Sequence, residues 1–380
     1  MLPEVLWRPR ARAFDADRRT RTDVLFVALF AVLITVHATV FFATLVIAPV
    51  TAEEQQSLTL LHLPVEVARA LTLPFTALLL VSLYVLGARI AGRWAGMAAV
   101  FAVLALNLRA DQPLTVIYGP SVATGGWIAA ALLAAALVLV PRHRAAAAAV
   151  LGAATLADGL IVLALPAFLI ALALFPAPRG LARRARLTDI ATTTGVFLVP
   201  AVLGQLLWLV DLGPAGYADR AQLLLAEFTP HPLVGWLQQQ AITFSAWHLP
   251  LAVTVGLVVF LFLAAGTGVV RYFAVPRPEE HGAPLTVIAR RLPVELWAAG
   301  LTLLLFSIWW AFSGDLAVVG PNLPVLVAVV PLITALAYRG AKWLLTVNRF
   351  WAFAAVVYLI GLVGARSVQA VLTLVQAFQR

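Results

Sequence analysis

Long apolar runs recur along this chain. The first, 24–47, contains no Asp, Glu, Lys or Arg, and further apolar runs follow it at short intervals. A run of about 18 or more such residues is long enough to cross a bilayer as a helix. Of the 380 residues, 63% are hydrophobic and only 11% are charged, and a soluble domain of this length cannot bury so much apolar surface. The sequence predicts an all-α, polytopic integral membrane protein.

Arginine clusters between these runs predict how the helices are oriented. Lys and Arg gather in the cytoplasmic loops of membrane proteins, and placing the clusters there gives about eleven spans of a multi-pass protein of the cell membrane. The expected spans include 70–88, 94–108 and 190–210. The basic segment 1–23 is then cytoplasmic and the C-terminus is external. All but five of the 26 Lys and Arg residues fall on the cytoplasmic side. Segments 211–250 and 365–380 are expected to lie on the outer surface as amphipathic helices.

The run 24–47 is expected to be a retained span, because it is longer than the apolar core of a signal peptide. A later apolar stretch, between Arg144 and Arg179, has basic residues at both ends and Asp158-Gly159 near its centre. One continuous helix would place the Asp158 carboxylate in hydrocarbon, at a cost of about 2.5–3.5 kcal/mol or more. We therefore expect a hairpin of two helices that turns at Asp158 on the outer side.

The charge and the absence of cysteine narrow the possible functions. The net charge of +9 comes from arginine clusters that set topology, so it does not indicate a nucleic-acid partner. With no cysteine, the chain has no disulfide, thiol nucleophile or cysteine metal site. Its histidines lack the spacing of zinc ligands, and phosphate-loop and metalloprotease motifs are missing. The sequence assigns no metal site and no cofactor, and it leaves open whether the protein requires a divalent cation.

Adjacent acids stand out in the first external loop, "IAPVTAEEQQSLTLLHLPVEVAR" (47–69). Glu53 and Glu54 are either ordinary residues of a hydrated loop or a general base beside a lipid-linked donor. Sugar transfer to a hydroxyl requires such a base to remove the acceptor's proton. Asp111 has the same two interpretations. Asp158 is either a turn residue or a functional acid at membrane depth.

Arg69 and Arg109 are two of the five external basic residues. One interpretation is that each side chain extends to the lipid headgroups and anchors the chain at the interface. The other is that each binds the phosphate of a lipid-linked donor, since a guanidinium matches phosphate geometry well. The sequence leaves both interpretations open.

Four stretches, taken in order, resemble one family of membrane enzymes. Residues 67–107, "VARALTLPFTALLLVSLYVLGARIAGRWAGMAAVFAVLALN", resemble its second span, basic turn and third span. Residues 152–175 resemble its glycine-rich helix, turn and proline-bearing return helix. Residues 229–250 resemble its external histidine-proline stretch, and 294–338 its late pair of spans. The family is the GT-C glycosyltransferases of the protein O-mannosyltransferase and lipid A aminoarabinose-transferase type.

The resemblance covers 24–345, which leaves 346–380 as a last span and an external tail. It implies a glycosyltransferase that moves a sugar from a polyprenyl-phosphate donor to a cell-envelope acceptor at the outer face. The catalytic acid of the family lies in the first external loop, usually as Asp-Glu, and Glu53-Glu54 stands there in this chain. The implied site comprises catalytic acids Glu53, Glu54, Asp111 and Asp158, donor-phosphate ligands Arg69 and Arg109, and acceptor or lipid contacts His231, Trp247 and His248.

Departures from the family pattern keep a second hypothesis open. The second external loop reads Tyr118-Gly119-Pro120-Ser121 where the family carries an aspartate, and Asp158 stands in place of a turn lysine. The alternative is a non-catalytic protein of the same fold that binds lipid or stabilises a complex with a membrane protein partner. A secondary transporter is a third hypothesis, but the inverted repeats expected of one are not evident in the sequence.

Overall fold

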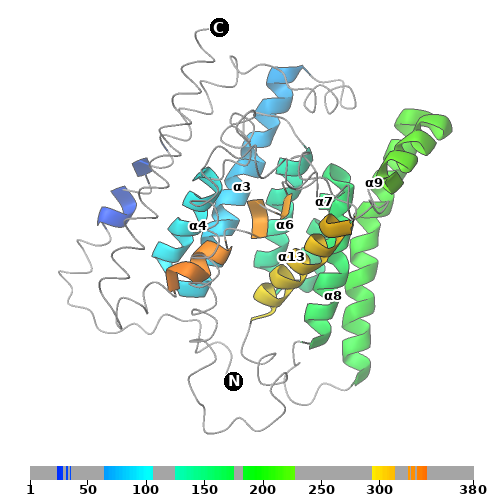
Figure 1. Ribbon diagram of the computed structural model, residues 1–380. Coiled ribbons are helices and arrows are strands. Elements are labelled where there is room, and N and C mark those ends of the chain that lie inside the picture. The colour runs from blue at the N-terminus through cyan, green and yellow to red at the C-terminus, as the bar shows by residue number, and fades with distance from the viewer. Residues whose placement is uncertain are drawn as a thin grey trace. The chain divides into compact units, whose positions relative to one another are not determined.

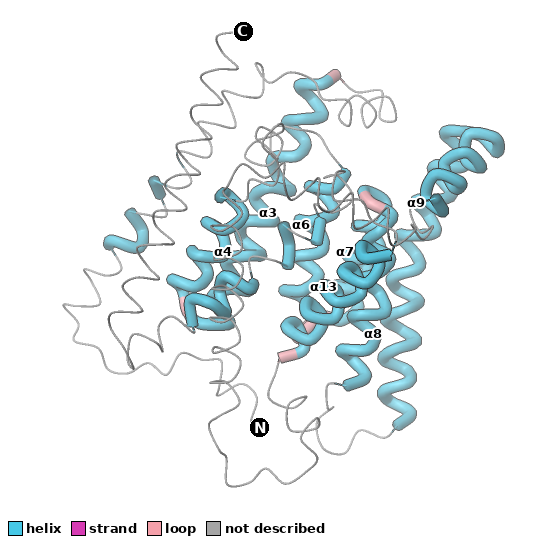
Figure 2. Tube along the Cα trace, viewed as in Figure 1, coloured by secondary structure: helices cyan, strands magenta, loops and turns pink. Residues whose placement is uncertain are grey.

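The computed structural model of the protein describes residues 24–28, 31–32, 35, 64–105, 125–174, 183–226, 293–312, 324–325, 327–329 and 332–339. Within these residues all regular structure is helical, and none is a strand (Figure 2). The prediction of an all-α protein is thus confirmed for this part of the chain. The chain forms two compact units, 1–124 with 255–272 and 331–380, and 125–254 with 273–330.

A helix pair, α3 (Val65–Ala91) and α4 (Arg93–Ala105), forms the main described part of the first unit (Figure 1). Gly92 separates the two helices, with φ 93° and ψ 177°, a backbone conformation that is essentially restricted to glycine. The helices then approach so closely that a Cβ on Gly87 would lie 2.8 Å from the carbonyl oxygen of Ala95. The expected spans 70–88 and 94–108 therefore correspond to two helices joined by a tight turn.

One face of α3 is buried along most of its length. Seven of its buried positions are three or four residues apart, as expected for one side of a helix: Arg69, Thr72, Thr76, Leu79, Leu83, Leu86 and Ile90. The two threonine hydroxyls donate within the helix, from Thr72 to the carbonyl oxygen of Arg69 at 2.7 Å and from Thr76 to that of Thr72 at 3.0 Å. At the other end, Nη1 of Arg339 donates to the carbonyl oxygen of Ile90 at 3.1 Å.

The second unit contains six described elements: α6 (Gly125–Leu139), α7 (Arg144–Ala157), the short 3₁₀ helix η3 (Gly159–Leu163), α8 (Ala164–Leu174), α9 (Arg183–Ala226) and α13 (Val294–Phe312). α7 packs against both α6 and α9, and α8 packs mainly against α13 (Figure 1). A glycine lets α7 and α9 approach closely, because a Cβ on Gly152 of α7 would meet the carbonyl oxygen of Phe197 in α9. Arg144 and Asp189 add an ion pair between α7 and α9.

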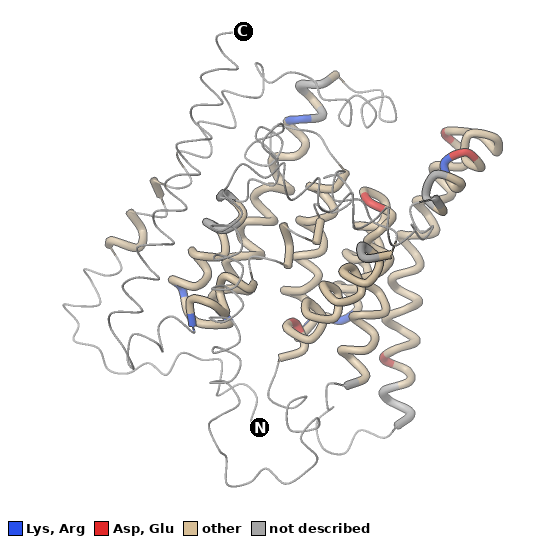
Figure 3. Tube along the Cα trace, viewed as in Figure 1, with Lys and Arg blue, Asp and Glu red and all other residues tan. Residues whose placement is uncertain are grey.

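Two helical segments make up α9. At Gly213 the backbone leaves the helical region, with φ 70° and ψ 173°, and Pro214 follows, which removes one backbone donor from the helix. The segment before Gly213 contains the expected span 190–210. Figure 3 shows the charged residues of α9 near its start and around the break, with uncharged helix between them. The segment after Gly213 is the start of the expected external region, and the rest of that region, 227–250, lies outside the described residues.

Two helical stretches among the described residues are long and apolar enough to cross a membrane, Arg69–Ala91 and Leu187–Gln222. They differ in burial, since 39% of the apolar window is buried in the first and only 11% in the second. The other apolar helical stretches in the described part of the chain are 10–17 residues long. The expectation of about eleven spans thus stays a prediction.

Candidate functional site

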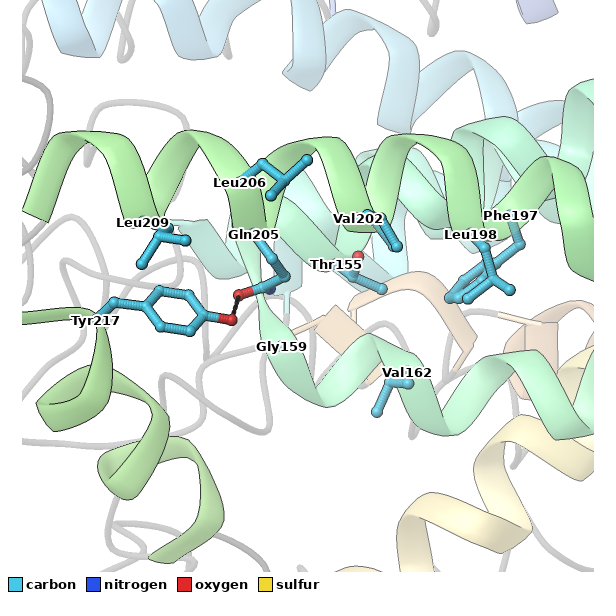
Figure 4. Close-up of a pocket in the computed structure, with 11 residues that line it drawn as sticks. Thr155, Gly159, Val162, Phe197, Leu198, Val202, Gln205, Leu206, Leu209 and Tyr217 are labelled. Carbon is cyan, nitrogen blue, oxygen red and sulfur yellow. Dashed lines mark hydrogen bonds between the residues drawn. The ribbon is translucent and has the colours of Figure 1, made fainter. Parts of the chain in front are cut away.

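A pocket of about 420 Å³ lies in the second unit, between α7 and η3 on one side and α9 on the other. Its size falls within the range of about 300–1,000 Å³ that is typical of small-molecule sites. Figure 4 shows α9 along one side, η3 along the other and Tyr217 at one end. The wall is mainly aliphatic and aromatic, and its polar side chains come from Thr155, Gln205 and Tyr217.

The residues of α9 that line the pocket lie along one side of the helix. The lining positions alternate in steps of one and three residues: Phe197, Leu198, Ala201, Val202, Gln205, Leu206 and Leu209. Phe197 is 2% exposed and closes the inner side against α7, whereas Val202 and Leu206 are each 50% exposed. The pocket is therefore closed toward α7 and open along the outer flank of α9.

The polar end of the pocket joins the two segments of α9. The Tyr217 hydroxyl donates to Oε1 of Gln205 at 3.2 Å, although twelve residues separate them (Figure 4). On a straight helix that separation is about 18 Å, so the break at Gly213 is required for this contact. Close by in sequence, the Arg220 guanidinium carbon lies 3.9 Å from the ring centroid of Trp208. Trp, Tyr and Arg are typical of the membrane–water interface.

Asp158 lies at the turn between α7 and η3, as expected. α7 ends at Ala157, and Oδ1 of Asp158 accepts a hydrogen bond from the backbone N–H of Leu160 at 2.9 Å. This contact caps the first turn of η3 in the manner of an Asx turn. The next residue, Gly159, lines the pocket, and in Figure 4 the chain then runs back beside α9 toward Val162. The predicted interruption of the helix at Asp158 is confirmed. The position of this turn on the outer side and the role of Asp158 as a catalytic acid stay predictions.

Arg69 belongs to the other unit and lies in the first turns of α3. Arg69 is only 1% exposed, and its carbonyl oxygen accepts a hydrogen bond from the hydroxyl of Thr72. The interpretation of Arg69 as an interfacial anchor that extends to the headgroups does not fit this burial. The second interpretation, a ligand for a donor phosphate, is neither supported nor contradicted by it. Asp158 and Arg69 thus lie in separate units, each in its own local environment.

The other predicted site residues lie outside the described part of the chain: Glu53, Glu54, Arg109, Asp111, His231, Trp247 and His248. Among the residues that are described, no three His, Asp or Glu side chains gather in a way that would hold a metal ion. The expected roles of these residues stay predictions.

Sequence reasoning did not single out Gln205 and Tyr217. A polar residue inside an apolar run is one available signal, and Gln205 lies in "LVPAVLGQLLWLV", which otherwise contains no polar side chain except Trp208. The Gly213-Pro214 pair is a second signal, because such a pair marks a break in a helix. What the sequence lacks is any indication that the segment after the break folds back onto Gln205.

No family model, curated protein or solved structure matches the chain. The resemblance to GT-C glycosyltransferases is therefore an expectation from the sequence. Chemically, the described pocket offers an apolar wall with an amide and a phenol at one end. Such a wall suits a hydrocarbon ligand, because apolar contact supplies binding energy and the few polar groups fix orientation.

Proposed function

We propose that the chain is a polytopic α-helical membrane protein with α9 at its lipid-facing surface. The exposure of α9 is the observation that carries the proposal. A soluble protein buries an apolar helix of this length in its core, whereas the residues of α9 form a broad exposed stripe: Leu198, Val199, Val202, Leu203, Leu206, Leu207 and Val210. Exposed apolar surface of this extent marks a lipid or protein interface, and its position far from the N-terminus excludes a signal peptide.

We further propose that the protein transfers a sugar from a polyprenyl-phosphate donor to a cell-envelope acceptor at the outer face. The support for this reaction is the acid pair Glu53-Glu54 in the first external loop, together with the resemblance to GT-C enzymes. One of the two carboxylates would remove the proton of the acceptor hydroxyl as that hydroxyl attacks the anomeric carbon, and the bond from this carbon to the phosphate oxygen breaks to release polyprenyl phosphate. The alternative, a non-catalytic lipid-binding protein, is favoured by the capping bond of Asp158, which gives that carboxylate a structural role.

The membrane topology is testable with single cysteines, because the chain contains none of its own. We choose Ser57→Cys and Asp219→Cys on the side expected to be external, and Arg142→Cys on the side expected to be cytoplasmic. A membrane-impermeant maleimide should label the first two in intact cells and the third only after permeabilisation. Equal labelling of all three in intact cells, or recovery of the protein in the soluble fraction after a carbonate wash, would contradict the proposal.

The reaction is testable by transfer of radiolabelled sugar from polyprenyl-phosphate donors in membranes that contain the protein. We expect transfer with the wild type and with Glu66→Gln, a control acid from the same region. The double variant Glu53→Gln/Glu54→Gln should lose transfer at unchanged expression. Transfer in the double variant above an empty-membrane control would exclude Glu53 and Glu54 as the base. Wild-type transfer that does not exceed that control across a donor panel would favour the non-catalytic alternative.

A further inference from the structure

We infer that the pocket between α9 and the α7–η3 turn binds one acyl chain of a zwitterionic phospholipid from the outer leaflet. This inference rests on the proposed placement of α9 in the membrane and is independent of the proposed sugar transfer. It concerns the pocket already described, whose wall residues come from α7, η3 and α9 within one compact unit.

The dimensions of the pocket match one acyl chain. Its wall extends along α9 from Phe197 to Leu209, and twelve residues of helix correspond to about 18 Å. One leaflet of the hydrocarbon core is about 15 Å thick, half of about 30 Å. A helix that crosses the bilayer therefore presents the pocket along the depth of a single leaflet. The volume of about 420 Å³ leaves room for one narrow chain along that length.

The open flank provides lateral access from the bilayer. Leu198, Val202 and Leu206 line the pocket and are also exposed on the outer side of α9. The apolar wall is thus continuous with the surface that faces lipid under the proposed topology. A hydrocarbon chain enters such a pocket sideways without carrying its headgroup through the apolar region, which would otherwise cost several kcal/mol.

The polar side chains of the pocket lie toward the Leu209 end of its wall, within the apolar stretch of α9. Gln205 and Tyr217 meet there because the chain turns back at Gly213 (Figure 4). The side-chain amide of glutamine carries two N–H donors in addition to the oxygen that accepts from Tyr217. The ester carbonyl of a glycerophospholipid is an acceptor, and it lies at this depth, between the acyl chain and the headgroup. Trp208 and Tyr217 are the residue types that favour this zone.

The charges near this end favour a zwitterionic headgroup over an anionic one. Asp211 and Asp219 are exposed, while Arg220 is half-buried with its guanidinium over the Trp208 ring. Among the described residues around the break in α9, two carboxylates and one guanidinium leave a net negative charge. A monoester phosphate, as in a polyprenyl-phosphate carrier, bears more than one negative charge and is repelled there. A zwitterionic phospholipid carries no net charge and is accommodated.

A matched pair of α9 variants tests the inference. Val202 lines the pocket, and Val199, three residues earlier on the same helix, is exposed without lining it. The full chain is purified in detergent, and its retained lipid is extracted, identified and quantified by mass spectrometry. Wild type and Val199→Trp should retain zwitterionic phospholipid at a similar ratio. Val202→Trp should lower retention by about tenfold, the change that corresponds to about 1.4 kcal/mol of binding free energy.

A second variant and a second measurement guard against a folding defect. Leu206→Trp fills the same pocket one helical turn further on and should reproduce the loss. In wild-type membranes, a phosphatidylcholine with a diazirine in its acyl chain should crosslink to a peptide of α9 that contains Val202 or Leu206. Equal retention in Val202→Trp and Val199→Trp, polyprenyl phosphate as the retained lipid, or crosslinks confined to other helices would overturn the inference. Cysteine labelling tests the membrane placement separately.

Discussion

The phenol of Tyr217 donates a hydrogen bond to the amide oxygen of Gln205 across the break in α9, at 3.2 Å. Because both groups are half-buried, this bond should contribute about 0.5–1.5 kcal/mol to the free energy of unfolding. We expect Tyr217→Phe and Gln205→Met each to lower stability by an amount in that range. The measurement is reversible unfolding in mixed micelles of increasing SDS content, followed by tryptophan fluorescence.

The double variant completes a thermodynamic cycle for this contact. If the two side chains act through one another, Tyr217→Phe/Gln205→Met should cost less than the sum of the single variants. A coupling free energy of zero would show that the hydrogen bond does not fix the angle between the two segments of α9.

Close packing of α7 on α9 depends on Gly152. A Cβ at this position would meet the carbonyl oxygen of Phe197 and the ring of Pro200, and neither backbone nor proline ring moves easily. Overpacking of this kind costs about 1–3 kcal/mol, so Gly152→Ala should unfold at lower SDS content than the wild type. Gly195→Ala is the control, because a Cβ at Gly195 in α9 meets nothing within 4 Å.

In the control variant Gly195→Ala, alanine replaces glycine at an exposed helical position, and this change stabilises a helix by up to about 1 kcal/mol. The two substitutions are chemically identical and should therefore change stability in opposite directions. Similar effects of Gly152→Ala and Gly195→Ala would mean that α7 and α9 are not in close contact at Phe197.

The break in α9 depends on the backbone of Gly213. Its φ of 70° and ψ of 173° lie in a region that other residues occupy at a cost of about 1–3 kcal/mol. A Cβ there meets nothing within 4 Å, so the expected loss of stability in Gly213→Ala comes from the backbone alone. Gly300→Ala, in an equally open position of α13, should not lose stability in the same unfolding measurement. If Gly213→Ala matched Gly300→Ala, the positive φ would be dispensable.

Much of the local helical structure was predictable from the sequence. The runs 70–88 and 94–108 became α3 and α4, because a basic, glycine-containing turn separates two apolar stretches. The reversal at Asp158-Gly159 was predictable for a similar reason, since a carboxylate beside glycine interrupts an apolar helix and supplies a cap.

The three-dimensional contacts were not predictable in the same way. Hydropathy placed Arg69 near the end of a span, yet it carries no information on which helix face is covered, and Arg69 is almost fully buried. The helix that contains the span expected at 190–210 begins earlier, at Arg183, and a second segment follows the break at Gly213 and ends at Ala226. The pocket itself depends on the return of Tyr217 to Gln205, a contact that hydrophobic periodicity does not encode.

Two substitutions of Asp158 separate its structural role from a catalytic one. Oδ1 of Asp158 accepts the N–H of Leu160, and an asparagine oxygen can accept the same bond. Asp158→Asn should therefore keep wild-type stability, whereas Asp158→Ala should lose about 0.5–2 kcal/mol with the cap. Both are measured by SDS unfolding, alongside sugar transfer in membranes.

The transfer assay then tests whether the charge of Asp158 matters. Asparagine preserves the shape and the cap but removes the negative charge, so a purely structural aspartate predicts wild-type transfer in Asp158→Asn. Because the carboxylate is held by the turn that it caps, we expect this outcome. Loss of transfer in Asp158→Asn at unchanged stability would instead assign the carboxylate a direct part in the reaction. In that case Asp158 would join Glu53 and Glu54 as a functional acid.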